Sequence, residues 1–189
     1  MPIEKGEILL SIARNTIANA LGLPVSTPEN ASWLQEQGAT FVTLMQTGKL
    51  RGCIGTLEAY RPLHADVQSN ALAAAFRDLR FPPLRHAELD HTQVEVSLLS
   101  TREPIVFESE QHALQQLRPE IDGIIFEYSH CRSTFLPQVW EQLPDPETFM
   151  AHLKRKAGLA PDFWAAGVKL ARYTVIKWKE NVRNEENIA

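Results

Sequence analysis

Apolar residues recur at helical spacing in two stretches of the chain. Over residues 4–21 they are Ile8, Leu9, Ile12, Ala13, Ile17, Ala20 and Leu21. Intervals of three and four residues place such positions on one face of an α-helix, and Gly22 is suited to end it. A second helix is predicted from Pro62 to about Asp78. Its alanines at 71, 73, 74 and 75 allow it to lie close against a sheet.

Alternating apolar and polar residues predict the strands. A strand is expected at 93–100, because residues 93–98 alternate cleanly, which is typical of a half-buried strand. The other strands are expected at 39–46, 50–57, 122–128 and 172–178, with 132–136 as the partner of 122–128 in a hairpin. The first half of the chain therefore runs hairpin, helix, strand. The second half repeats this order, with its longer helix at 147–157.

This order of elements predicts an α+β fold with a largely antiparallel sheet and flanking helices. We expect a single domain over residues 1–189, built from two related halves at about 39–100 and 122–178. A helix at 110–117 is expected to join the halves, and a polar tail is expected at 180–189.

The hexapeptide Leu50-Arg51-Gly52-Cys53-Ile54-Gly55 is unusual for a strand. Glycine weakens a strand interior, and it marks either a bulge or a close approach by a backbone or a ligand. In an extended chain Arg51 and Cys53 share a face, and a neighbouring guanidinium favours the reactive thiolate form of cysteine. The alternative is that Cys53 is a small packed residue, as free cysteine often is.

Other polar residues are expected near this strand. Glu95 and Ser97 alternate with apolar neighbours, so their face can coincide with that of Cys53 if both strands share a sheet. Glu95 would then pair with Arg51, either as a structural ion pair or as an orienting or proton-transferring carboxylate. Asp78 and Arg80 follow the second helix, where a capping and turn-fixing role is the first interpretation and ligand binding the second.

Composition excludes several classes of function. The 189 residues carry a net charge of −4, which disfavours nucleic-acid binding, and they contain no apolar run long enough to span a bilayer. Two cysteines make no disulfide framework, and the N-terminus lacks a signal-peptide pattern, so a cytoplasmic location is expected. The segment His86, Glu88, Asp90, His91 is interpreted as a solvated loop. We expect no metal and no cofactor, since no zinc or nucleotide motif occurs.

The chain resembles the AmmeMemoRadiSam system protein A (AMMECR domain) family. The resemblance rests on the intact Leu-Arg-Gly-Cys-Ile-Gly run and on matches at 41–44, 73–74, 78–81, 95–97, 122–124, 135–140 and 156–159. One departure is His130-Cys131-Arg132, where the family has a glycine-containing turn. The resemblance implies a duplicated α+β fold and an intracellular protein of a family often encoded beside, or fused to, a Memo-like protein and a radical SAM protein, which are its expected partners. It implies no particular reaction.

Two hypotheses of function follow. In the first, the chain is a cysteine-dependent enzyme of a modification pathway, with Cys53, Arg51 and Glu95 as candidate catalytic residues. In the second, it is a non-catalytic binding or adaptor module that presents the Arg51–Cys53 surface to a protein or small ligand. Candidate ligand-binding residues are Gly52, Gly55, Ser97, Asp78 and Arg80. Cys131 is expected to be functionally silent.

Overall fold

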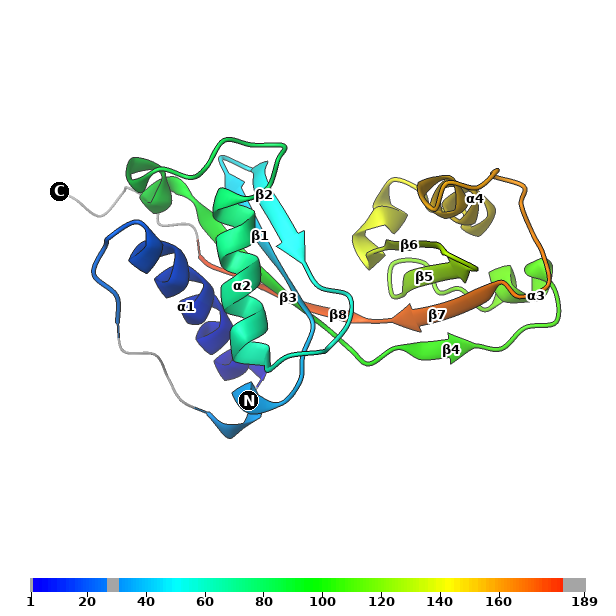
Figure 1. The fold of residues 1–189 in the computed structure, drawn as a ribbon, viewed down its shortest axis with the longest axis horizontal. Coiled ribbons are helices and arrows are strands. Elements are labelled where there is room, and N and C mark those ends of the chain that lie inside the picture. Colours follow the sequence, from blue (N-terminus) through cyan, green and yellow to red (C-terminus); the bar gives the residue numbers. More distant parts are fainter. Residues whose placement is uncertain (1, 27–30, 182–189) are drawn as a thin grey trace. The chain divides into compact units, whose positions relative to one another are not determined.

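The computed structural model describes residues 2–26 and 31–181, which fall into two compact units (Figure 1). The first unit comprises the chain up to Leu99 together with the segment from Ile176, and the second comprises Ser100–Val175. The expected halves differ from these units near the end of the described chain, because residues 176–181 belong to the first unit. None of the described helices is long and apolar enough to cross a membrane.

The first unit contains a four-stranded sheet. Its strands are β1 (Thr40–Gln46), β2 (Lys49–Gly55), β3 (Gln93–Leu99) and β8 (Val175–Lys179), in the order β2-β1-β3-β8. β1 pairs antiparallel with both β2 and β3. Strand β2, which carries most of the hexapeptide, is therefore an edge strand.

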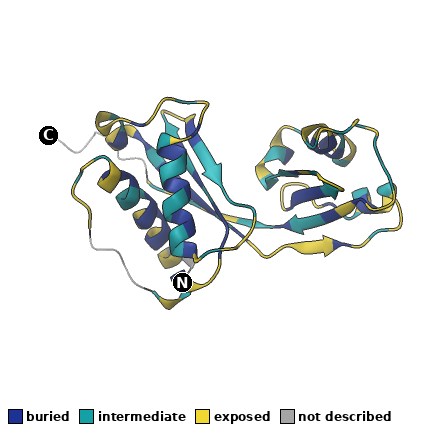
Figure 2. Cartoon of the chain, in the orientation of Figure 1, coloured by how far each residue is buried: buried dark blue, intermediate teal, exposed yellow. Residues whose placement is uncertain are grey.

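One face of this sheet carries the core of the unit. Val42, Leu44, Val94 and Val96 are fully buried there. Helices α1 (Pro2–Ala20) and α2 (Leu63–Phe76) pack against this face (Figure 1). The short helices η1 (Ser32–Gln35) and η2 (His86–His91) add Leu34 and Leu89 to the same core. Figure 2 shows the buried stripes along α1 and α2 that result.

The second unit contains the other four-stranded sheet, in the order β4-β7-β5-β6. Its strands are β4 (Glu103–Ile105), β5 (Gly123–Tyr128), β6 (Cys131–Phe135) and β7 (Lys169–Tyr173), and its helices are α3 (Glu110–Gln115), η3 (Pro137–Glu141) and α4 (Pro146–Lys156). Trp140 stacks on Phe149 in its core, with ring centroids 3.7 Å apart.

The two sheets have the same topology. In each, a hairpin is followed by a helix and by a third strand that pairs with the first strand of the hairpin, which gives β2-β1-β3 and β6-β5-β7. The fourth strand of each is exchanged: β4 follows β3 in the chain but pairs with β7, and β8 follows β7 but joins β3. The predicted α+β fold with antiparallel strand pairing is confirmed, but the strands form two sheets where one was expected.

Two details differ from the expectation. The single strand expected at 172–178 is two strands, because β7 ends at Tyr173 and β8 begins at Val175 in the other sheet. Strand β4 was not expected, since three residues that include Pro104 are too short to show alternation.

Candidate functional site

Cys53 lies on β2 directly opposite Thr43 of β1, and Thr43 lies opposite Glu95 of β3. Residues that oppose one another in neighbouring strands share a face, so these three form a row across the sheet, on the face away from the buried valines. Thr43 Oγ1 lies 3.2 Å from Cys53 Sγ and donates a hydrogen bond to it. With strands about 4.8 Å apart, Cys53 and Glu95 are separated by about 10 Å. The structure thus brings Cys53 and Glu95 to one face, with Thr43 between them.

Arg51 does not join this row, because β2 contains a bulge. Leu44 pairs with Gly52 and Met45 pairs with Leu50, so Arg51 is an extra residue that interrupts the alternation. The Arg51 guanidinium binds Glu88 of η2, with Nε 3.1 Å from Oε1 and Nη2 3.4 Å from Oε2. Only 8% of Arg51 is exposed.

The expected ion pair between Arg51 and Glu95 is therefore wrong. Glu95 pairs instead with Lys177 of β8, whose Nζ lies 3.0 Å from Oε2. A sequence pattern cannot reveal this exchange of partners, because it depends on the bulge and on the position of β8 in the first sheet.

Glu88 is a residue of this site that the sequence reasoning missed. Besides the Arg51 side chain, its carboxylate accepts a hydrogen bond from the Arg85 backbone amide at 2.8 Å. The hydrogen bond from Arg51 is the main reason why the pKa of Glu88 is lowered. The segment that was interpreted as a solvated loop is a 3-10 helix. The available signal was an acidic residue three positions after a helix start, where it can satisfy a free amide.

Gly52 and Gly55 are explained by packing inside the first unit. A Cβ atom on Gly52 would lie 2.2 Å from the carbonyl oxygen of Ala74, so α2 can approach β2 only where the strand has no side chain. A Cβ atom on Gly55 would lie 2.2 Å from the ring of Phe41. The groups that lie close to these glycines are therefore the Ala74 carbonyl and the Phe41 ring of the protein itself. Ser97 of β3 lies opposite Phe41 of β1, and only 7% of it is exposed.

Asp78 and Arg80 hold the backbone of Cys53 from outside the sheet. The Cys53 amide donates to Asp78 Oδ2 at 2.9 Å, and Arg80 Nη2 donates to the Cys53 carbonyl at 3.1 Å. The outward amide and carbonyl of an edge strand have no neighbouring strand to pair with. At Cys53, the side chains of Asp78 and Arg80 therefore make the hydrogen bonds that a neighbouring strand would make.

The same two side chains bind each other. Arg80 Nε and Nη2 donate to the two carboxylate oxygens of Asp78, at 2.9 and 2.7 Å. This hydrogen-bonded pair, assisted by the Cys53 amide, holds the pKa of Asp78 well below its usual value. The pKa of Arg80 is raised, chiefly by its hydrogen bond to Asp78. The guanidinium that contacts Cys53 is therefore that of Arg80, through the Cys53 carbonyl.

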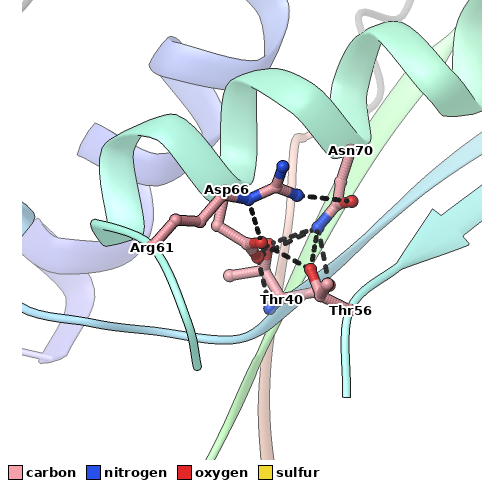
Figure 3. A network of polar contacts seen from close by, with 5 residues as sticks. All are labelled: Thr40, Thr56, Arg61, Asp66 and Asn70. Carbon is pink, nitrogen blue, oxygen red and sulfur yellow. Dashed lines mark hydrogen bonds and ion pairs between the residues drawn. The ribbon is translucent and has the colours of Figure 1, made fainter. Parts of the chain in front are cut away.

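A buried polar network on α2 was also missed. Asp66 is fully buried, and its Oδ2 accepts hydrogen bonds from Thr40 N at 2.8 Å and Thr40 Oγ1 at 2.7 Å (Figure 3). Its Oδ1 accepts from Arg61 Nε at 2.8 Å and from the Thr56 hydroxyl. Asn70, one turn along α2, donates to the Thr40 carbonyl at 2.9 Å. The network ties α2 to β1 and to the segment after β2. The signal in the sequence was two polar residues four apart, next to the apolar stripe of the helix.

A cleft of about 950 Å³ lies elsewhere in the first unit. It is lined by parts of α1, the β1–β2 turn, η2, β3 and β8. The Arg14 side chain, which lines this cleft, has a structural role, because it binds Glu180 and donates a hydrogen bond to the Leu89 carbonyl at 3.1 Å. None of the eight residues expected to form the site lines this cleft. Within residues 2–26 and 31–181, no group of three or more histidine, cysteine or acidic side chains could hold a metal ion, and both cysteines are free.

Chemically, the arrangement is a half-buried thiol on a braced edge strand. Its main-chain groups are fixed by an ion pair, and a threonine hydroxyl donates to its sulfur. The arginine that was expected to activate the thiol is bound to Glu88 and buried.

A family model described as AMMECR1 matches residues 10–178. Protein MJ0810 of Methanocaldococcus jannaschii is 37% identical over 178 residues, covering 92% of this chain and 89% of that protein. A protein of Sulfurisphaera tokodaii is 39% identical over 97% of this chain and 85% of its own length. The crystal structure of the uncharacterized protein PH0010 from Pyrococcus horikoshii matches with a TM-score of 0.83 and 34% identity, over 94% of this chain and 92% of that one. Fold and sequence together show that the chain belongs to the AMMECR1 family.

Proposed function

We propose that the chain is a non-catalytic binding module whose recognition surface is the outer edge of β2 at Cys53, with Asp78 and Arg80. The observation that carries this proposal is the bracing of Cys53. Its amide and carbonyl are both fixed by the Asp78–Arg80 pair, so the edge of β2 is a rigid surface before any partner arrives. Preorganised surfaces bind more tightly because less conformational entropy is lost on binding.

This surface differs from the one expected from the sequence. Arg51 is buried against Glu88 and offers little to a partner, whereas 56% of the Arg80 side chain is exposed. Arginine is among the residues that dominate binding energy at protein interfaces. The exposed cation of the proposed surface is thus Arg80 in place of Arg51.

The partners that we propose are the Memo-like and radical SAM proteins of a cytoplasmic modification pathway. The support is the resemblance to AmmeMemoRadiSam system protein A, carried by the hexapeptide at 50–55. The test is isothermal titration of the purified chain with each of these two proteins from the same organism. Arg80→Gln should lower the affinity at least about tenfold. The control Arg155→Gln, an exposed residue of α4, should leave it unchanged.

If Arg80→Gln binds with the same affinity as the control Arg155→Gln, the interface lies elsewhere. An absence of binding by the wild-type chain would remove these two proteins as partners.

The second candidate is the cysteine-dependent enzyme. It is favoured by one observation: the Cys53 thiol is only half-buried, and the Arg80 guanidinium lies beside the same residue, 3.1 Å from its carbonyl oxygen. Alkylation by iodoacetamide at pH 7 separates the two functions, with Cys131 as an internal reference. A catalytic nucleophile should react at least about tenfold faster than Cys131, because the thiolate is the reactive form. Reaction no faster than that of Cys131 supports the binding module.

A further inference from the structure

Leu79 is a fully exposed leucine, with a relative exposure of 101%. It lies in the connection between α2 and η2, residues 77–85, which Figure 2 shows as largely exposed. The next most exposed large apolar residue in the described part of the chain is Val106, at 82%. Burial of a leucine side chain contributes about 1.5–3 kcal/mol. A partner that covers Leu79 would therefore gain binding free energy of this size.

The turn that presents Leu79 is braced on both sides. Leu79 stands between Asp78 and Arg80, whose side chains bind each other and the Cys53 backbone. The Arg80 amide donates to Asp78 Oδ1 at 3.1 Å, and the Phe81 amide donates to the Asp78 carbonyl at 3.0 Å. The leucine is therefore held out from the surface by a rigid turn.

The far end of the connection is fixed as well. Pro82 and Pro83 restrict the backbone, and Leu84 is 3% exposed within the core of the first unit. The Leu84 amide also donates to the Ala75 carbonyl at 2.8 Å. Both anchors of the connection are thus part of the folded unit, which lowers the entropy that Leu79 loses when it is captured.

The connection is a basic patch on an acidic chain. Residues 77–85 contain three arginines and one aspartate, whereas the whole chain has a net charge of −4. Arg77 and Arg85 are exposed, and the Arg80 guanidinium lies 5.5 Å from the centroid of the Phe81 ring. Complementary charge around an apolar contact guides a partner to it and excludes partners of the wrong sign.

We propose that Leu79 is a docking anchor that enters an apolar pocket, rimmed by carboxylates, on a partner protein. This inference rests on the proposed binding function and adds the position of the anchor and the chemistry of the partner's surface. A protein is favoured over nucleic acid because the chain as a whole carries a net charge of −4, which repels a phosphate backbone. A membrane surface is disfavoured by the overall negative charge of the chain.

The test places a photo-crosslinking amino acid at position 79 of the full chain, in cells that express it naturally. The control carries the same amino acid at position 106, which is exposed and apolar but lies in the second unit. A protein that crosslinks at 79 and not at 106 is identified by mass spectrometry, purified and titrated against the unlabelled chain. We expect Leu79→Ser to lower the affinity about 10- to 100-fold, and Val106→Ser to leave it within twofold. Arg77→Glu should weaken binding, most strongly at low salt.

Several results would overturn the proposal. One is equal crosslinking at positions 79 and 106, or none at either. Another is a captured protein that binds the Leu79→Ser chain as tightly as the wild type. A crosslinked species that nuclease removes, or that is lipid, would assign the connection to a different class of partner. Loss of binding by Arg80→Gln with full retention by Leu79→Ser would keep the β2 edge as the interface and remove only the anchor.

Discussion

The backbone amide of Cys53 donates a hydrogen bond to Oδ2 of Asp78 across a distance of 2.9 Å. The two residues are 25 positions apart in the chain, and all of α2 lies between them. This bond links the hexapeptide strand to the turn that carries Leu79. A change on either side is therefore expected to affect the other.

Asp78→Ala should destabilise the first unit. The substitution removes the acceptor of the Cys53 amide and the anionic partner of Arg80, and loss of hydrogen bonds to a charged group costs about 1–3 kcal/mol. Urea unfolding measures the effect. Asp90→Ala, which removes an exposed carboxylate of η2, serves as the control and should change the free energy of unfolding by less than about 0.5 kcal/mol. Equal stability of the two variants would show that the bond contributes nothing.

The stability of the chain should fall on the acid side through Asp78 and Glu88. The pKa of each carboxyl is lowered in the folded state, from usual values of 3.8 and 4.5. A group with a lowered pKa contributes stability above its unfolded pKa, and this contribution is lost as the pH falls through the folded pKa. The stability difference between the wild type and Asp78→Ala should therefore be constant near neutral pH and shrink below about pH 4. Chemical unfolding at a series of pH values checks this, and a difference that grows in acid would contradict it.

Gly52→Ala should be costly although alanine is small. The new Cβ would lie 2.2 Å from the Ala74 carbonyl oxygen, so β2 and α2 must move apart. Such overpacking costs about 1–3 kcal/mol. Cys53→Ala is the matched control on the neighbouring residue, since it keeps both main-chain hydrogen bonds to Asp78 and Arg80. A melting temperature of Gly52→Ala equal to that of Cys53→Ala would refute the packing role of the glycine.

Asp66→Asn should cause the largest loss of stability. The substitution leaves Arg61 without its carboxylate partner and turns an acceptor of buried donors into an amide. Because the Arg61 side chain is 23% exposed, the cost comes mainly from the hydrogen bonds of the fully buried carboxylate, and each bond to a charged group contributes about 1.5–3 kcal/mol. Thermal unfolding measures the loss, and Glu36→Gln, at an exposed position, is the control. A loss below about 1 kcal/mol would mean that the network is not needed to hold α2 on the sheet.

Cys131→Ser should leave binding unchanged. Cys131 is the first residue of β6, opposite Tyr128, and belongs to the second unit. It has neither the flanking glycines of Cys53 nor a bracing ion pair among the described contacts. Titration with the Memo-like and radical SAM proteins should give the same affinity as the wild type within twofold. A large loss would show that the second hairpin carries the function.

The sequence by itself determined the elements and their class. Alternation in 93–98 and helical spacing in 4–21 are local patterns, because a half-buried strand or helix must place apolar residues on one side. The repeated order of hairpin, helix and strand likewise predicted two related halves, but it placed their strands in one sheet, whereas the structure has two. The family resemblance came from the uninterrupted hexapeptide and its flanking matches. These features were readable because each depends on residues that are close in the chain.

The tertiary structure decided which residues meet. A single extra residue in β2 moves Arg51 from Cys53 to Glu88, and alternation cannot foresee a bulge. The exchange of β8 into the first sheet gives Glu95 its partner Lys177 from 82 residues away. The bracing of Cys53 by Asp78 and Arg80, and the packing of Gly52 under Ala74, both depend on how α2 returns to the edge of the sheet. The physical reason is that hydrogen bonds and close contacts act over a few ångströms in space, at any separation along the chain.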